Sequence, residues 1–126
     1  MKRLLVYVAG PYTPRGGGDI DAQMREVEHN LRRAVEVAEE IILRGHIPMI
    51  PHTHTYGFGM RTSLPQASNL YYQWDKEILR RCDAILRYDR SFGADREWRW
   101  AGEFGLIRVS RADELPEGTS LLREVI

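Results

Sequence analysis

Short apolar runs alternate with amphipathic helical patterns along this chain, and this alternation limits the folds that it can adopt. Residues 4–9 form a continuous apolar run, which is typical of a strand covered on both faces of a parallel sheet. Further strands are predicted over residues 46–51, 83–88 and 106–109. Because helices separate these strands, we expect right-handed crossovers and a mainly parallel sheet. The sequence therefore predicts a three-layer α/β fold of flavodoxin or Rossmann type, with four or five strands.

The first predicted helix is the clearest. Apolar residues recur every three or four positions from Ile20 to Ile41, which indicates one face of a long amphipathic helix. Asp19 or Asp21 is expected to cap its start, and Gly45 to end it. The other predicted elements are helices over 66–81, 94–103 and 119–125 and loops over 10–18 and 52–64.

Composition and charge narrow the class of protein. The length of 126 residues fits one domain over 1–126, and the 18 basic and 18 acidic residues cancel, which argues against a nucleic-acid partner. No run approaches the roughly 20 apolar residues of a membrane span. The single cysteine, Cys82, allows no intrachain disulfide and suggests a cytoplasmic protein. A net charge of zero also favours self-association.

Loops at the carboxyl ends of the strands are where such sheets bind ligands. On a helix beginning near Gly93, the face that carries Ala94, Ala101 and Phe104 also carries Glu97. A carboxylate on a face built for burial requires partners or a function. A surface carboxylate on a helix of different phase is the alternative interpretation.

Four other residues are candidates for the same site as Glu97. Tyr7 lies in the first strand, where a buried hydroxyl requires a partner, although core filling explains it as well. Asp75 lies one turn before Ile78 and Leu79 on the helix that leads into the third strand, and a solvated carboxylate is the simpler interpretation. Ser91 and Gly93 offer a hydroxyl and free backbone N–H groups at a helix start, which suit a phosphate or a sugar hydroxyl.

Three segments, taken in order, resemble the motifs of the nucleoside 2-deoxyribosyltransferase superfamily, which includes deoxynucleoside monophosphate N-hydrolases and small uncharacterised members. Residues 6–11, Val-Tyr-Val-Ala-Gly-Pro, look like its opening strand. Residues 75–84 are similar to its middle motif, an aspartate followed by Cys-Asp-Ala. Residues 91–101, Ser-x-Gly-Ala-x-x-Glu-x-x-x-Ala, resemble its catalytic motif. The resemblance spans residues 4–109.

The resemblance implies roles for individual residues. Glu97 would be the nucleophile, Asp75 the group that handles the base or its proton, and Tyr7 the group that holds the nucleophile. Ser91 would contact a 5′-phosphate in the hydrolase branch. The remaining substrate-binding positions would be Gly10, Pro11, Gly93 and Ala94.

The function expected from this resemblance is cleavage or transfer of the N-glycosidic bond of a nucleoside or its monophosphate. A glycosyl-Glu97 ester would form by double displacement, with no metal or organic cofactor. The small-molecule nucleoside or nucleotide would be the only partner besides further copies of the chain, in a homodimer or larger homo-oligomer. The alternative is a non-catalytic nucleotide- or nucleotide-sugar-binding module, in which Glu97 would face solvent or form a salt bridge.

Other signals carry less weight. His52 and His54 could begin a metal site, but no third ligand is apparent, and loop polarity or substrate contact explains them better. Residues 16–18, three glycines, lack the flanking residues of a phosphate loop. Aromatic residues near the loops could stack a base, pack in the core or form a subunit contact; they are Tyr56, Phe58, Tyr71, Tyr72 and Trp74.

The ionisation of Glu97 is the last expectation. Burial should raise the pKa of this carboxyl, whereas the helix dipole and a hydrogen bond from Tyr7 should lower it. Because a nucleophile must be ionised, we expect the second pair of effects to dominate.

Overall fold

A four-stranded, all-parallel sheet forms the centre of the computed structural model, which describes residues 2–12, 18–55 and 68–122. The strand order is β2-β1-β3-β4, which matches the first four strands of the flavodoxin-like order. The α/β fold class expected from the sequence is thus confirmed. The strands are β1 (Leu5–Ala9), β2 (Ile47–Met49), β3 (Ala84–Arg87) and β4 (Ile107–Val109).

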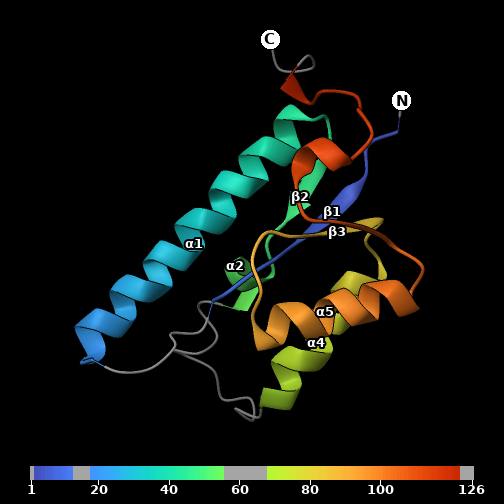
Figure 1. Cartoon of the computed structure of the whole chain (residues 1–126). Coiled ribbons are helices and arrows are strands. Elements are labelled where there is room, and N and C mark those ends of the chain that lie inside the picture. The colour runs from blue at the N-terminus through green and yellow to red at the C-terminus, as the bar shows by residue number, and fades with distance from the viewer. Residues whose placement is uncertain (1, 13–17, 56–67, 123–126) are drawn as a thin grey trace.

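Helices cover both faces of the sheet and complete the three layers (Figure 1). The long helix α1 (Ile20–Leu43) lies on one face, and α4 (Ser68–Arg80) and α5 (Phe92–Glu103) lie on the other. Side chains of β1 alternate between the two cores, with Val6 and Val8 toward α1 and Tyr7 toward α5. This double burial explains why the first strand is apolar at every position.

The helix α1 begins and ends where the sequence predicts. The Asp19 side chain accepts a hydrogen bond from the backbone N–H of Ala22 at 2.8 Å, and Gly45 follows the helix with a φ of 97°. The apolar stripe of α1 is buried only in its later part, because Ile20 is 70% exposed and Met24 is 48% exposed. A helix of 24 residues is about 36 Å long, so its first turns extend past a strand of about 17 Å (Figure 1).

Three local predictions also need correction. The segment predicted as a loop over 52–64 begins with a short helix, α2 (Pro51–Thr55), and residues 56–64 lie outside the described residues. The helix α5 begins at Phe92, two residues earlier than expected, because Ser91 caps it. A 3₁₀ helix at Ala112–Glu114 was not predicted, and residues 119–120 are not helical. Residues 123–125 of the predicted terminal helix lie outside the described residues.

The segment after β4 returns to the end of the sheet where the strands begin. The buried ring of His46 accepts a hydrogen bond from Leu4 N–H at 2.9 Å through Nδ1, and its Nε2 contacts the carbonyl oxygen of Pro116. Gly118 N–H donates to Arg44 O at 3.0 Å. These contacts join the first strand, the end of α1 and the C-terminal segment, and they assign His46 a structural role.

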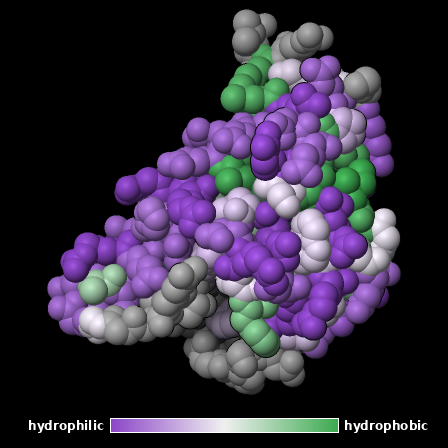
Figure 2. Space-filling view, in the orientation of Figure 1, coloured by the Kyte–Doolittle hydropathy of each residue, from purple (hydrophilic) through white to green (hydrophobic). Residues whose placement is uncertain are grey.

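The surface in the view of Figure 2 is largely hydrophilic along α1, as expected for the outer side of an amphipathic helix. Within the described ranges, no helix combines the length and the apolar character needed to cross a membrane.

Candidate active site

The candidate residues gather where the strand order reverses direction. The chain places β2 on one side of β1 and then crosses to place β3 on the other side. In open parallel sheets, ligands bind at the carboxyl edge beside such a switch point. Tyr7 lies on the central strand β1, and Glu97 lies in the second turn of α5, which follows β3.

The helix α5 brings Glu97 against the sheet. Ala94 and Ala101, at 1% and 0% exposure, allow a close approach of the helix backbone, and Glu97 between them is 6% exposed. The Tyr7 hydroxyl donates a hydrogen bond to Oε2 of Glu97, so the contact expected from the sequence is present. Phe104, expected on the same face, is only partly buried.

Asp75, from α4, is the second carboxyl of this site, and its side chain is partly buried. It interacts electrostatically with both Tyr7 and Glu97, which places the three groups together although they are distant in sequence. Within the described part of the chain, its Oδ1 atom is buried without a hydrogen-bond partner. An unpartnered buried oxygen is costly and is a natural contact for a ligand donor.

Burial dominates the ionisation of Glu97. Removal from water raises the pKa of this carboxyl to about 7, and the hydrogen bond from Tyr7 and the charge of Arg96 oppose that rise only in part. The expectation that the helix dipole and the tyrosine bond would outweigh burial is therefore wrong. The physical reason is the depth of the site, which the sequence pattern does not convey.

The other two groups are shifted in the same direction. Burial raises the pKa of Asp75 to about 6, against the charge of Arg96. Burial, then the charges of Glu97 and Asp75, raise the pKa of the Tyr7 hydroxyl well above its ordinary value. Near neutral pH the Tyr7 phenol is therefore un-ionised, and the pKa values of the Asp75 and Glu97 carboxyls lie close to the pH of the solution. Groups with such pKa values suit acid–base and nucleophilic chemistry.

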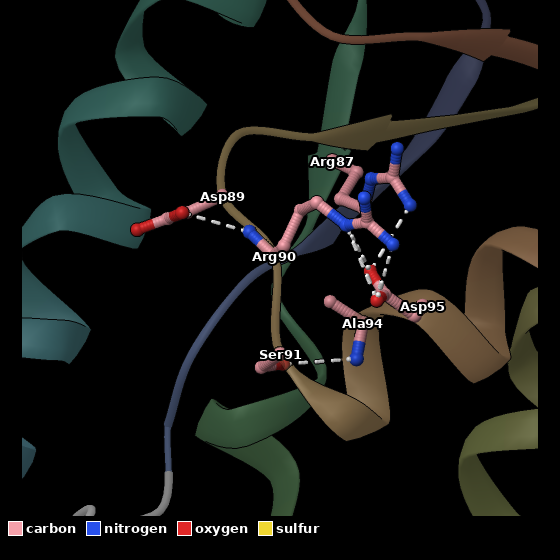
Figure 3. A network of polar contacts seen from close by, with 6 residues as sticks. All are labelled: Arg87, Asp89, Arg90, Ser91, Ala94 and Asp95. Carbon is pink, nitrogen blue, oxygen red and sulfur yellow. Dashed lines mark hydrogen bonds and ion pairs between the residues drawn. The ribbon is translucent and has the colours of Figure 1, made fainter.

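Ser91 and its neighbours form the start of α5 (Figure 3). The Ser91 hydroxyl accepts a hydrogen bond from Ala94 N–H at 3.0 Å, so that N–H is not available to a phosphate. Asp95, in the first turn, receives ion pairs from Arg87 at 3.1 Å and Arg90 at 3.0 Å. The expected binding position is thus partly occupied by the helix cap, while the space beside Gly93 is open.

Gly10 and Pro11 follow β1 and are both buried. A Cβ atom on Gly10 would lie 2.1 Å from the Tyr88 ring, so only glycine fits beneath that ring. The neighbouring ring of His52 stacks on Tyr12, with 4.3 Å between centroids. Burial lowers the pKa of His52 to about 4, against its hydrogen bond to the Gly10 backbone, so His52 is neutral at physiological pH.

Arg96 is the functional candidate that the sequence analysis did not identify. Its guanidinium carbon lies 4.1 Å from the centroid of the Tyr72 ring and 5.1 Å from that of Trp100. Tyr72 and Trp100 meet edge to face at 4.7 Å, so Tyr72 packs within the chain. The one signal in the sequence was the position of Arg96 next to Glu97, and this signal is too weak to single out one arginine among many.

Other expectations lie partly outside the described residues. Tyr56, Phe58 and residues 16–17 fall there, as does the side chain of His54. Among the side chains that the structure describes, no three His, Cys, Asp or Glu residues gather as a metal site would require. The buried thiol of Cys82 has its pKa raised to about 12, first by burial and then by Asp83.

An open groove of about 610 Å³ lies at the end of α1, by the edge of the sheet where the strands begin. Its lining includes Leu43 and the ion pair between Arg111 and Asp113. It contains none of the residues singled out by the sequence, and it presents no orphaned buried polar atom. The carboxyl edge of the sheet is therefore the better candidate site.

The family of the chain is shown by a match to the model of a domain of unknown function, DUF7768, over residues 4–109. Because the match covers most of the 126 residues, the chain belongs to this family. No curated protein matches the sequence. The matched region contains all of the candidate residues, whose chemistry is the basis for a functional proposal.

Proposed function

We propose that this protein cleaves or transfers the N-glycosidic bond of a nucleoside or a nucleoside monophosphate, with Glu97 as the nucleophile. The observation that carries the proposal is the buried Glu97 carboxyl, hydrogen-bonded to Tyr7 and accompanied by the partly buried Asp75. The resemblance of three ordered motifs to the nucleoside 2-deoxyribosyltransferase superfamily supports the choice of substrate class.

In the first step, a Glu97 carboxylate oxygen attacks C1′ of the sugar while the bond from C1′ to the base nitrogen breaks. Asp75 supplies or orients the proton that the departing base takes up. Tyr7 holds the carboxylate in place by its hydrogen bond. The enzyme then carries the sugar as an ester of Glu97.

In the second step, the oxygen of a water molecule bonds to C1′ and the ester bond from C1′ to Glu97 breaks. A water proton returns to Asp75, which restores the starting state. A second base in place of water would give transfer instead of hydrolysis, with its nitrogen forming the new bond to C1′. Neither step calls for a metal or an organic cofactor.

The alternative function is a non-catalytic nucleotide- or nucleotide-sugar-binding module. That function predicts Glu97 in solvent or in a salt bridge away from the site. Glu97 is instead 6% exposed and paired with a neutral phenol, and no cation lies within ion-pair distance of it among the described residues. A carboxyl kept buried without an ion pair favours the catalytic proposal, because its burial is costly unless it has a function.

A nucleobase-release assay tests the proposal. Purine and pyrimidine deoxynucleosides and their 5′-monophosphates would be incubated with the protein, with and without a second free base. We expect release of a base from at least one substrate, its loss in Glu97→Gln, and its retention in Glu103→Gln, which changes an exposed carboxylate of the same helix. Full activity in Glu97→Gln, or no release from any substrate, would overturn the proposal.

The proposal implies a small-molecule substrate and no nucleic-acid or membrane partner. We further propose a cytoplasmic location and assembly into at least a homodimer. Both follow from the sequence expectations of a single buried cysteine and zero net charge.

A further inference from the structure

Two arginines near the start of α5 are neutralised by a carboxylate, and Arg96 differs from them. Arg87 and Arg90 both pair with Asp95. Among the described residues, no carboxylate lies within ion-pair distance of Arg96, and its Nε atom is buried without a hydrogen-bond partner. Its positive charge is therefore not cancelled by direct contact with an anion.

Aromatic rings hold this guanidinium in place. The Arg96 guanidinium carbon lies 4.1 Å from the Tyr72 centroid, 5.1 Å from that of Trp100 and 5.8 Å from that of Phe92. Such contacts fix a cation over ring faces without neutralising it. Tyr72 and Asp75 are three residues apart on α4, so the ring that holds Arg96 shares a helix face with Asp75.

We propose that Arg96 is a positioning residue of the active site, whose ring-held positive charge allows one of the two carboxyls of the site, Asp75 and Glu97, to remain ionised. Its place in the reaction rests on the proposed function, but its effect on the carboxyls exists without substrate. Two carboxyls close together and shielded from water cannot readily both ionise, and an unpaired cation beside them offsets part of that cost. The Arg96 charge acts on both carboxyls and opposes the effect of burial on each.

The other ionisable groups around the pair do not supply this charge. Tyr7, from β1, is neutral, and the Cys82 thiol has its pKa raised to about 12. Lys76 lies on α4 with its Nζ atom 5.1 Å from the Trp100 centroid, yet it is not among the groups that shift either carboxyl. Arg96 is thus the cation on which the ionisation of this pair depends.

The test is a pH titration of the side-chain carboxyls by ¹³C NMR on the whole protein, without substrate. Spectra of Asp75→Asn and Glu97→Gln assign the two signals. In Arg96→Met, which keeps an apolar stem against Tyr72, we expect the Asp75 signal to titrate about 1–3 pH units higher, the range for loss of a nearby opposite charge. Arg99→Met removes an exposed charge from the same helix and should leave both signals unchanged.

A second variant separates charge from packing. Arg96→Lys keeps a positive charge that the Tyr72 ring can still hold by a cation–π contact, so its carboxyl titrations should lie close to those of the unaltered protein. Near-UV circular dichroism shows independently whether each variant is folded. Arg96→Lys remains informative if Arg96→Met does not fold. In that case Tyr72→Leu, which removes the ring under the guanidinium, should raise the Asp75 titration. Unchanged titrations in a folded Arg96→Met or Tyr72→Leu protein would overturn the proposal. Because no substrate is involved, this result is independent of whether the protein releases a base.

Discussion

At the scale of single residues, the site is defined by a carboxylate buried where a neutral residue would be more stable. Glu97 and Asp75 have pKa values of about 7 and about 6, both raised mainly by burial. The proposed chemistry requires Glu97 ionised and, for proton donation, Asp75 protonated. The pair must then carry one proton, and its two apparent pKa values belong to the pair rather than to either residue.

The pH dependence of base release follows from this requirement. We expect a bell-shaped profile of kcat/KM, with limbs near the pKa values of about 6 and about 7. In Tyr7→Phe, loss of the hydrogen bond that lowers the pKa of Glu97 should move the alkaline limb to higher pH and reduce the maximum rate. A profile that rises to a plateau above pH 8 would show instead that Asp75 does not donate the proton.

The free energy of unfolding should fall as the pH rises through the pKa of Glu97. Because burial raises the pKa of Glu97 from 4.5 to about 7, the folded protein binds this proton more tightly than the unfolded chain does. The resulting stabilisation is complete below pH 4.5 and is lost as the pH rises through about 7.

Glu97→Gln, which resembles the protonated state, should therefore be more stable than the unaltered protein at pH 8. The shift corresponds to an increase in the free energy of unfolding of up to about 3 kcal/mol. The difference should disappear near pH 4.5, and urea unfolding at the two pH values measures it. Equal stability of the two proteins at pH 8 would show that Glu97 is not a destabilising buried charge.

At the scale of elements, the sequence predicts regular structure well where the signal is local. The apolar run of β1, the Asp19 cap of α1 and the glycines Gly45 and Gly105 all mark their boundaries by side-chain or backbone chemistry within a few residues. The contact between Tyr7 and Glu97 could also be expected, because parallel strands bring their carboxyl ends to one edge.

What the sequence does not show depends on contacts between distant elements. The exposure of Ile20 and Met24 follows from the relative lengths of α1 and the sheet. The placement of Arg96 on Tyr72 depends on how α4 and α5 pack, and the pKa of Glu97 depends on the depth at which that packing leaves it. Periodicity gives the phase of a helix but not these distances.

The cap of α5 gives a prediction at this scale. Ser91→Ala removes the hydroxyl that accepts from Ala94 N–H, which should lower the free energy of unfolding by about 1 kcal/mol. Urea unfolding measures the loss, and Ser110→Ala, at an exposed serine outside the helices, is the matched control. Equal unfolding curves for the two variants would argue against the cap as a stabilising contact.

At the scale of the whole molecule, self-association is the open expectation. The chain has no net charge to keep copies apart, and large apolar side chains are exposed on α1, with Ile20 at 70% and Leu43 at 72%. Light scattering at micromolar concentration should report at least twice the chain mass of 14.6 kDa. A single species of 14.6 kDa would contradict the expected homo-oligomer.

The central claim is that Glu97 forms a covalent bond to the sugar, and intact-protein mass spectrometry tests it most directly. The protein would be mixed with a nucleoside whose sugar carries fluorine at C2′, which slows both steps and lets the ester accumulate when its base is a good leaving group. The account predicts a mass increase of one sugar residue, located by fragmentation to Glu97 and absent from Glu97→Gln. Release of the base without any adduct, or an adduct on another residue, would contradict it.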